Sequence, residues 1–308
     1  MIGNATKLFS HPDRLEAFWR GLPVVPVTVE IRPTDRCNQK CAYCSRHSHA
    51  SMSFAELARI FTECAELGVR GFVFSGGGEP LLALPDDLGT VMPCGLITNG
   101  SVLKSAAFWR QFTWVRFSVD SFDPALYQKL RGVPFPDDLL RNIRHAQGRT
   151  CVGVQMVVTE DTKEHVVEFV EAADDAGAEY VQVRPREDIP NPPWPSDEEL
   201  SRAEALATDD FGVLVRRDKI GVDMSGPCHA GSFMLTILPD LTCAVCSCTG
   251  AQTAVVGSLR KQTLREIVYG QRRSKVLGDL RTELCPPNCK GANINRALSN
   301  CGTHAEFL

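Results

Sequence analysis

The chain has 308 residues, of which 44% are hydrophobic and 23% are charged, and its formal net charge is −4. These proportions are ordinary for a folded protein with one large and one small domain. The net charge and the lack of a Lys/Arg-rich block give no electrostatic reason to expect nucleic acid as a partner. No apolar run approaches the roughly 18 residues of a membrane span, and the first residues show no export signal. We therefore expect a cytoplasmic protein whose 13 cysteines serve mainly in metal binding rather than in disulfides.

Strand-like and helical patterns alternate along the first two thirds of the chain. A short amphipathic helix over residues 11–20, with Ser10 as its expected cap, precedes the first strand. Six apolar runs predict strands at Val27–Ile31, Gly71–Phe74, Gly95–Ile97, Val115–Val119, Val152–Val158 and Tyr180–Val183. The clearest helical patterns between them are Ser53–Leu67, Val102–Gln111, Asp138–Ala146 and Lys163–Ala176. This alternation predicts an α/β fold with a parallel sheet, and six units suit a partial (β/α)6 barrel with its ligands at the carboxyl ends of the strands.

The pattern changes after the sixth unit. A proline-rich stretch, Ile189–Pro195, interrupts the alternation, and beyond Gly226 cysteines become frequent. We expect an N-terminal helical extension (1–26), a barrel (27–217) and a small C-terminal domain (218–308) made of a hairpin and a helix that bind a metal cluster.

Three cysteines, Cys37, Cys41 and Cys44, follow the first strand with the spacing C-x3-C-x2-C. Three thiolates can hold three irons of a cubic iron–sulfur cluster and leave the fourth iron open, whereas a zinc site usually shows paired C-x2-C motifs. The spacing resembles the signature of the radical S-adenosylmethionine (radical SAM) superfamily, with Tyr43 in its aromatic position. The resemblance implies a [4Fe-4S] cluster whose open iron binds SAM. It also implies reductive cleavage of SAM to a 5′-deoxyadenosyl radical and an electron donor such as flavodoxin or ferredoxin.

Further candidates for SAM binding stand at the carboxyl ends of the predicted strands. The run Gly76-Gly77-Gly78-Glu79 resembles the family's "GGEP" motif, whose backbone and glutamate bind the SAM amino group, although a tight turn ending at a proline gives the same pattern. The other candidates are Thr98, Asn99, Ser118, Asp120, Gln155 and Arg184. Period-two alternation places Ser118 and Asp120 on one face, where contacts to the SAM carboxylate or ribose are expected. Capping of a helix is the alternative for the serines of this segment.

A second group of cysteines occupies the last third of the chain. The stretch from Ser232 to Cys246 predicts a hairpin turning at Pro239-Asp240, and Lys261–Leu277 predicts a helix. This order resembles the SPASM/twitch module of radical SAM enzymes, although Leu241 replaces the usual turn glycine. The resemblance implies one auxiliary [4Fe-4S] cluster held by Cys228, Cys246, Cys285 and Cys289. Zinc remains an alternative, because four cysteines suit it equally.

This assignment of four ligands leaves three cysteines of the region without a cluster role, namely Cys243, Cys248 and Cys301. Cys248 lies two residues beyond a presumed ligand, and an extended chain would direct both side chains to the same face. Because related epimerases return a hydrogen atom from a cysteine, Cys248 is the predicted catalytic residue. Cys243, Cys301 or a tyrosine are alternative donors, and Cys248 is alternatively a cluster ligand. The remaining cysteines, Cys64, Cys94 and Cys151, sit in apolar patterns and are expected in the core.

The layout resembles that of aminoglycoside-pathway radical SAM enzymes, which include the neomycin-type epimerase and aminocyclitol dehydrogenases. About two dozen residues precede the first predicted strand, too few for a peptide-leader domain, so a small polar substrate such as an aminosugar is expected. Glu187, Asp188 and Asp223 are candidates to pair with its ammonium groups or form a solvated acidic rim. Three hypotheses follow: a sugar epimerase, a dehydrogenase that uses the auxiliary cluster, or a non-catalytic metal-binding scaffold. Peptide modification with a separate recognition protein is a fourth.

Overall fold

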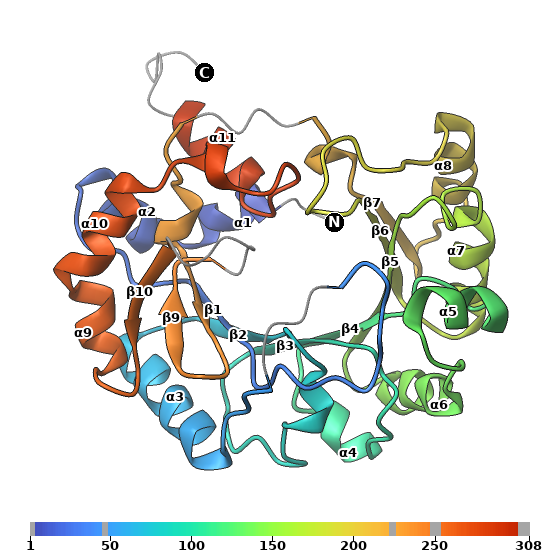
Figure 1. The fold of residues 1–308 in the computed structure, drawn as a ribbon, viewed down its shortest axis with the longest axis horizontal. Coiled ribbons are helices and arrows are strands. Elements are labelled where there is room, and N and C mark those ends of the chain that lie inside the picture. The colour runs from blue at the N-terminus through green and yellow to red at the C-terminus, as the bar shows by residue number, and fades with distance from the viewer. Residues whose placement is uncertain (1–3, 45–48, 222–225, 247–253, 301–308) are drawn as a thin grey trace.

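The structure, a computed structural model, describes residues 4–44, 49–221, 226–246 and 254–300. Its strands form a single curved sheet in the order β10-β9-β8-β1-β2-β3-β4-β5-β6-β7 (Figure 1). The strands are β1 (Thr28–Ile31), β2 (Gly71–Phe74), β3 (Cys94–Thr98), β4 (Trp114–Ser118), β5 (Cys151–Val157), β6 (Tyr180–Arg184), β7 (Gly212–Val215), β8 (Met234–Ile237), β9 (Thr242–Ala244) and β10 (Val255–Ser258). Strands β1 to β7 run parallel, and β8 lies parallel to β1 on its other side. The α/β fold class is therefore confirmed.

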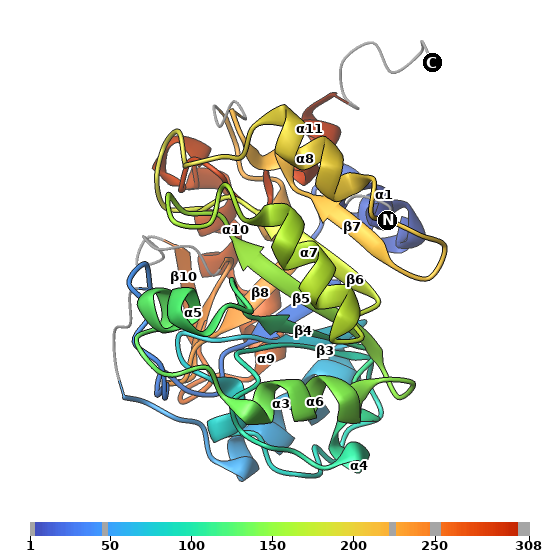
Figure 2. The same ribbon diagram turned by 90° about the vertical axis from the view of Figure 1, so that its right-hand side faces the viewer.

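Helices cover the outer side of the sheet, and the inner face of the sheet is turned toward the middle of the ring (Figures 1 and 2). The helices between the parallel strands are α3 (Phe54–Leu67), α4 (Ala106–Trp109), α5 (Pro124–Arg131), α6 (Asp137–Ala146), α7 (Val166–Asp175) and α8 (Asp197–Glu204). The terminal regions add α1 (Asn4–Lys7), α2 (Pro12–Trp19), α9 (Leu264–Tyr269), α10 (Gln271–Asp279) and α11 (Ala292–Asn300). None of the described helices has the length and apolar character needed to cross a bilayer.

Alternation along each strand separates the apolar core from the inner face. Val115 and Phe117 of β4 are fully buried in the core, whereas Arg116 and Ser118 are partly exposed on the opposite side. At the amino ends of the strands the inner face is filled by aromatic rings. A Cβ atom at position 95 would lie 2.2 Å from the ring of Trp114, so the glycine there is required for packing. Ligand contacts are therefore left to the carboxyl ends of the strands.

Most sequence predictions of elements agree with the structure, with some differences. The single helix predicted over Lys261–Leu277 is wrong, because the structure divides this segment at Gly270 into α9 and α10. The six predicted strands are confirmed, and β7 is an additional strand that extends the sheet. The prediction that Ser10 caps the helix near the N-terminus is wrong, because this helix, α2, begins after His11 with Pro12 in its first turn. The helix predicted from Val102 begins only at Ala106, where the side chain of Ser105 accepts a hydrogen bond from the Phe108 amide.

The hairpin of the C-terminal region joins the same sheet as the barrel strands. Strand β8 pairs in parallel with β1, and β9 turns back beside it in antiparallel fashion. The turn places Leu241, which stands where a glycine was expected, in the left-handed region with φ 68°. This backbone costs about 1–2 kcal/mol for a residue with a side chain, and burial of the leucine side chain offsets a similar amount.

Arg273 of α10 ties the C-terminal helices to the rest of the fold. Its side chain is 1% exposed and donates hydrogen bonds to the carbonyls of Val24 (2.8 Å) and Ser232 (2.8 Å). Burial lowers the pKa of Arg273 to about 10. The partners of this cation among the described residues are main-chain carbonyls, and removal of its side chain would leave them unsatisfied.

We predict that Arg273→Met lowers the free energy of unfolding by about 3 kcal/mol, since at least two buried carbonyls lose their donor. Arg272→Met is the matched control, because Arg272 is its exposed neighbour and should change stability by less than about 0.5 kcal/mol. Chemical denaturation of the two variants measures the difference. Equal effects would show that Arg273 does not hold the helices in place.

Candidate cofactor-binding site

The three-cysteine motif lies on the loop that follows β1. Cys37 and Cys41 are partly buried and Cys44 is exposed. The loop bends back on itself, because the Cys44 amide donates to the Cys41 carbonyl (3.2 Å) and the Gln39 amide donates to Cys37 Sγ (3.4 Å). All three thiols are thus presented by one short segment at the carboxyl end of the first strand, as the spacing predicts.

The glycine run after β2 packs against this loop. A Cβ atom on Gly77 would lie 2.2 Å from the Asp35 carboxylate, and one on Gly78 would lie 2.0 Å from the Arg36 carbonyl. A Cβ on Gly76 would likewise meet the Gly78 carbonyl at 1.9 Å. The contact is completed by the Glu79 amide, which donates to the Arg36 carbonyl at 2.8 Å. Side chains at Gly77 and Gly78 would displace the segment that leads into the cysteine loop, and a side chain at Gly76 would distort the turn itself.

The carboxylate of Glu79 has protein partners. One oxygen accepts from Thr98 Oγ1 (2.6 Å) and the Leu81 amide (2.9 Å), and the other accepts from the Asn99 amide (2.7 Å). Burial raises the pKa of Glu79, against the lowering effect of these bonds. The structure therefore gives Glu79 and Thr98, both predicted to contact SAM, a role in joining the ends of β2 and β3 beneath the loop.

Asn99 connects this network to the cysteine loop. Its Nδ2 donates to Asn38 Oδ1 (3.0 Å) and lies 4.0 Å from Cys37 Sγ, while its Oδ1 accepts from Ser101. Of the residues predicted at the end of β3, Asn99 is therefore the one adjacent to a candidate ligand thiol.

Period-two alternation predicted that Asp120 and Ser118 lie on one face of the strand, and this prediction is wrong. Strand β4 ends at Ser118, and Asp120 adopts φ 68°, so its side chain turns away beneath the cysteine loop. The carboxylate is 0% exposed and is bound by the Val157 amide (2.9 Å), the Tyr43 hydroxyl and Arg131 (2.8 Å). Burial and the Asp120 carboxylate raise the pKa of Tyr43 well above its usual value. Asp120 therefore makes these contacts within the protein, and its SAM contact stays a prediction.

Ser118, Gln155 and Arg184 remain on the inner face, as expected from their strand positions. Ser118 and Gln155 are register partners, and Gln155 Nε2 donates to Ser118 Oγ at 2.7 Å. Gln155 is 5% exposed, and its Oε1 has no hydrogen-bond partner among the described residues. A buried amide oxygen normally accepts a hydrogen bond, so this atom fits a donor on a bound SAM or substrate.

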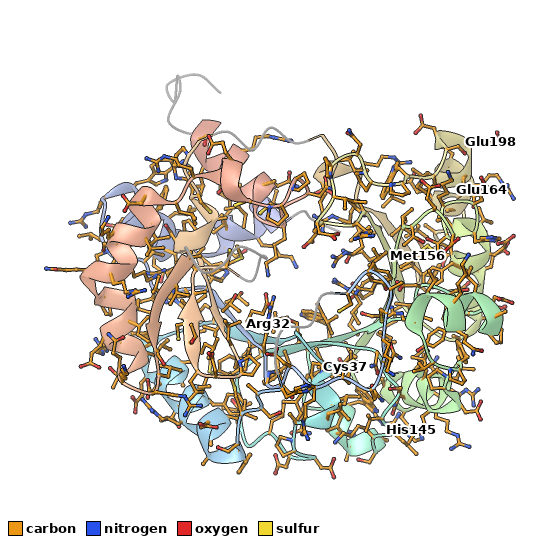
Figure 3. The ribbon with its side chains drawn as sticks, in the orientation of Figure 1. Arg32, Cys37, His145, Met156, Glu164 and Glu198 are labelled. Carbon is orange, nitrogen blue, oxygen red and sulfur yellow. The ribbon has the colours of Figure 1, made fainter. Side chains whose placement is uncertain are left out.

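Charged residues that sequence analysis did not select also occupy the inner face. Glu30 of β1 lies in ion pairs with Arg32 (3.3 Å) and Lys290. Arg32 lies toward the interior of the ring in Figure 3, whereas Glu164 and Glu198 lie on its outside. A charged residue within an apolar strand, such as Glu30, and a lysine directly after Cys289 were the signals that the sequence offered.

The acidic residues expected near a substrate are paired with the protein's own cations. Glu187 contacts Arg184 (3.3 Å) and Lys219 (2.5 Å), and Asp188 contacts Arg186 (2.5 Å). Burial alone would raise the pKa of Glu187, but these cations lower it to about 2. Asp223, the third acidic candidate, lies outside the described residues.

The four predicted auxiliary ligands lie in one neighbourhood of the C-terminal region. A side-chain hydrogen bond with Cys289, burial and the nearby Cys228 and Cys246 raise the pKa of Cys285. No three His, Cys, Asp or Glu side chains among the described residues converge as ligands of one metal ion would. The auxiliary cluster and its zinc alternative therefore both stay predictions.

The cysteines outside the two predicted sets of cluster ligands differ in burial. Cys243 is 0% exposed, and burial raises its pKa to about 12, so it belongs to the core near Cys64. Cys94 is also buried, as expected, but Cys151 is exposed at the start of β5, because the strand begins there at the edge of the fold. Cys248, the predicted hydrogen donor, and Cys301 lie outside the described residues.

We predict that Glu187→Gln weakens the acid dependence of stability. A carboxylate whose pKa falls from its usual 4.5 to about 2 stabilises the fold above pH 4.5, and this contribution is lost as the pH falls toward 2. The loss of stability between pH 5 and pH 3 should therefore be smaller in the variant by about 1–2 kcal/mol. Urea denaturation at both pH values measures it, with exposed Glu198→Gln as the control (Figure 3). Identical pH profiles for wild type and Glu187→Gln would contradict the charge assignment.

Comparison with known proteins places this geometry in context. Residues 31–173 match the family described as the Radical SAM superfamily. The "Probable GTP 3',8-cyclase" of Methanopyrus kandleri is 35% identical over 53% of this chain and 58% of its own length. The protein of the same name from Methanosarcina mazei is 30% identical over 46% and 48%. The chain thus spans about half the length of these curated relatives.

Solved structures share the fold over most of the chain. Streptococcus suis SuiB has a TM-score of 0.67 at 15% identity and covers 94% of this chain and 78% of its own. The protein anSMEcpe with bound AdoMet has a TM-score of 0.62 at 16% identity and covers 82% and 83%. Identity this low shows a common fold alone. Residues 31–173 are thus similar to the Radical SAM superfamily, and most of the chain shares the fold of these two structures.

Proposed function

We propose that this protein is a radical SAM enzyme that abstracts a hydrogen atom from a small polar substrate at the carboxyl ends of its strands. The observation that supports it most is the packing of Gly77 and Gly78 against the loop that carries Cys37, Cys41 and Cys44, within the matching domain. When bound, a reduced [4Fe-4S] cluster and SAM supply a radical that abstracts hydrogen. The chain's own residues present three thiols on one loop and keep glycine backbone beside them.

The inner face offers polar contacts for SAM or substrate. The orphaned Gln155 Oε1 accepts a hydrogen bond from a ligand hydroxyl or amino group, while Ser118 fixes the orientation of the amide. Arg184 Nε is likewise buried without a partner among the described residues. One acceptor and one donor on neighbouring strands suit a ligand with several polar groups.

The reaction we favour is epimerisation at one carbon. The substrate carbon loses a hydrogen atom from one face, and the thiol of Cys248 returns a hydrogen atom to the other. An external reductant then supplies one electron and one proton to restore the thiol. This assignment rests on the sequence, in which Cys248 follows the auxiliary ligand Cys246 by two positions.

Dehydrogenation is the second candidate, and the grouping of Cys228, Cys246, Cys285 and Cys289 favours it. A cluster there would accept the second electron from the substrate, while a proton leaves to a base or water, which yields a carbonyl product. A peptide-modifying reaction is the further alternative.

The substrate class is open to more than aminosugars. Glu187 and Asp188 are occupied by arginine and lysine, so they give no preference for an ammonium group. The relatives named GTP 3',8-cyclase make a nucleotide a second class to test. The assay panel should therefore contain aminoglycosides, aminocyclitols and nucleoside triphosphates.

The first prediction from the proposed function concerns SAM cleavage. Anaerobically reconstituted and reduced protein should form 5′-deoxyadenosine from SAM, and Cys41→Ser should reduce the rate by at least about 100-fold, since even partners outside the ligand set cost 10–100-fold. Cys151→Ser is the control, because this exposed thiol begins β5 at the opposite end of the strands. Liquid chromatography quantifies the product. Absence of cleavage in the wild type would favour a non-catalytic scaffold.

The second prediction separates epimerase from dehydrogenase. In D2O an epimerase incorporates one deuterium at a carbon of the product, and Cys248→Ala should still form 5′-deoxyadenosine while losing more than about 90% of the epimer, because only the returning hydrogen atom is missing. Mass spectrometry over the substrate panel measures both. A carbonyl product without deuterium on carbon would identify a dehydrogenase and contradict the role of Cys248.

A further inference from the structure

Helix α5 forms a platform for the cysteine loop. The Lys40 amide donates to the Arg131 carbonyl (2.9 Å), and the Ala42 amide donates to the Leu130 carbonyl (3.1 Å). The last carbonyls of a helix lack partners within it, so the loop satisfies two of them. Gly132, which ends the helix with φ 67°, is required because a Cβ there would lie 2.9 Å from the Lys40 carbonyl.

The side chain of Arg131 extends from this helix end to the thiol of Cys41, a candidate cluster ligand. Its Nη1 lies 3.7 Å from Cys41 Sγ and 3.5 Å from Gln39 Oε1, and its Nη2 contacts Asp120 at 2.8 Å. The arginine side chain is only 6% exposed and the aspartate side chain 0%. A buried guanidinium in contact with a candidate ligand interacts with its charge through little water, and hence with weak screening.

The groups around Arg131 fix its position. Gln39 Nε2 donates to the Tyr127 hydroxyl at 2.7 Å, and the Tyr43 hydroxyl donates to Asp120 from the other side. Asp120 is held in turn by the Val157 amide. Gln39 and Asp120 thus contact the guanidinium of Arg131, and their own hydrogen bonds hold these two partners in place. The guanidinium cannot rotate away from the Cys41 thiol without breaking these contacts.

We propose that Arg131 is a positioning residue of the proposed function, one that holds the cysteine loop and raises the reduction potential of the cluster on Cys37, Cys41 and Cys44. Reduction adds one electron and makes the cluster more negative, so a fixed positive charge favours the reduced state. Asp120 orients the guanidinium and partly offsets its charge. The pair therefore sets how readily a weak external donor delivers the electron that SAM cleavage requires.

Opposite charge changes test this inference. Arg131→Met should lower the ratio of reduced to oxidised cluster about tenfold at a fixed potential, which is about 59 mV for a one-electron couple. Asp120→Asn keeps the arginine and removes a negative charge, so its potential should rise. Arg131→Lys keeps the charge but cannot contact both Cys41 and Asp120, and it should fall between wild type and Arg131→Met.

The matched control is Lys129→Met on the same helix, which removes an equal charge from a side chain that is 64% exposed and paired with Asp161. Its potential should equal that of the wild type. Redox titration followed by electron paramagnetic resonance gives each potential, and iron content and thermal unfolding of each variant show whether the loop and fold are intact. If Arg131→Met binds no cluster, the direction of the shift in Asp120→Asn decides the matter.

The outcomes distinguish this inference from the proposed function. Opposite shifts in Arg131→Met and Asp120→Asn support it, whereas unchanged potentials, or shifts of the same sign, overturn it while wild-type SAM cleavage leaves the proposed function standing. A wild type that takes up no cluster would overturn both.

Discussion

The close contact between Gly76–Gly78 and the segment Asp35–Arg36 is the constraint on which the rest of the site depends. Three consecutive residues without side chains let the turn after β2 lie against the start of the cysteine loop, with main-chain hydrogen bonds across the contact. The buried carboxylate of Glu79 then fastens this turn to the end of β3 through Thr98 and Asn99. The ends of three parallel strands and one loop therefore form a single unit, in which the glycine backbone is held against the segment that leads to the three thiols.

Burial and charge are balanced differently on the two sides of the cysteine loop. Beneath it, Asp120 and Arg131 form an ion pair with almost no exposed surface. The Val157 amide and the Tyr43 hydroxyl also donate to the Asp120 carboxylate, whereas Arg131 Nε has no hydrogen-bond partner among the described residues. Such a pair contributes more to specificity of position than to net stability, because desolvation offsets much of the attraction. On the inner face, Glu30 and Glu187 stay ionised beside lysine and arginine. There the Gln155 Oε1 is buried without a partner among the described residues.

The C-terminal region is part of the same sheet rather than a separate attachment. Strand β8 lies beside β1, so the hairpin that leads to Cys246 is aligned with the strand that leads to Cys37. Lys290 follows Cys289 and reaches Glu30 on β1, which links the two cysteine groups by an ion pair.

The sequence by itself determined the parts whose signals are local. The alternation of apolar strands and amphipathic helices predicted the six parallel strands, and the spacing of Cys37, Cys41 and Cys44 placed three thiols on one loop. Only the tertiary structure decided which polar residues are used for contacts within the protein. The side chain of Asp120 lies beneath the loop because its backbone leaves the strand conformation. The hydroxyl of Thr98 donates a hydrogen bond to the carboxylate of Glu79, which is distant in the sequence. Arg131 had no recognisable motif, since its meaning comes from a helix end that meets the loop after folding. Periodicity and spacing follow from neighbouring residues, whereas a charge or hydrogen bond between distant segments is fixed only when packing brings them together.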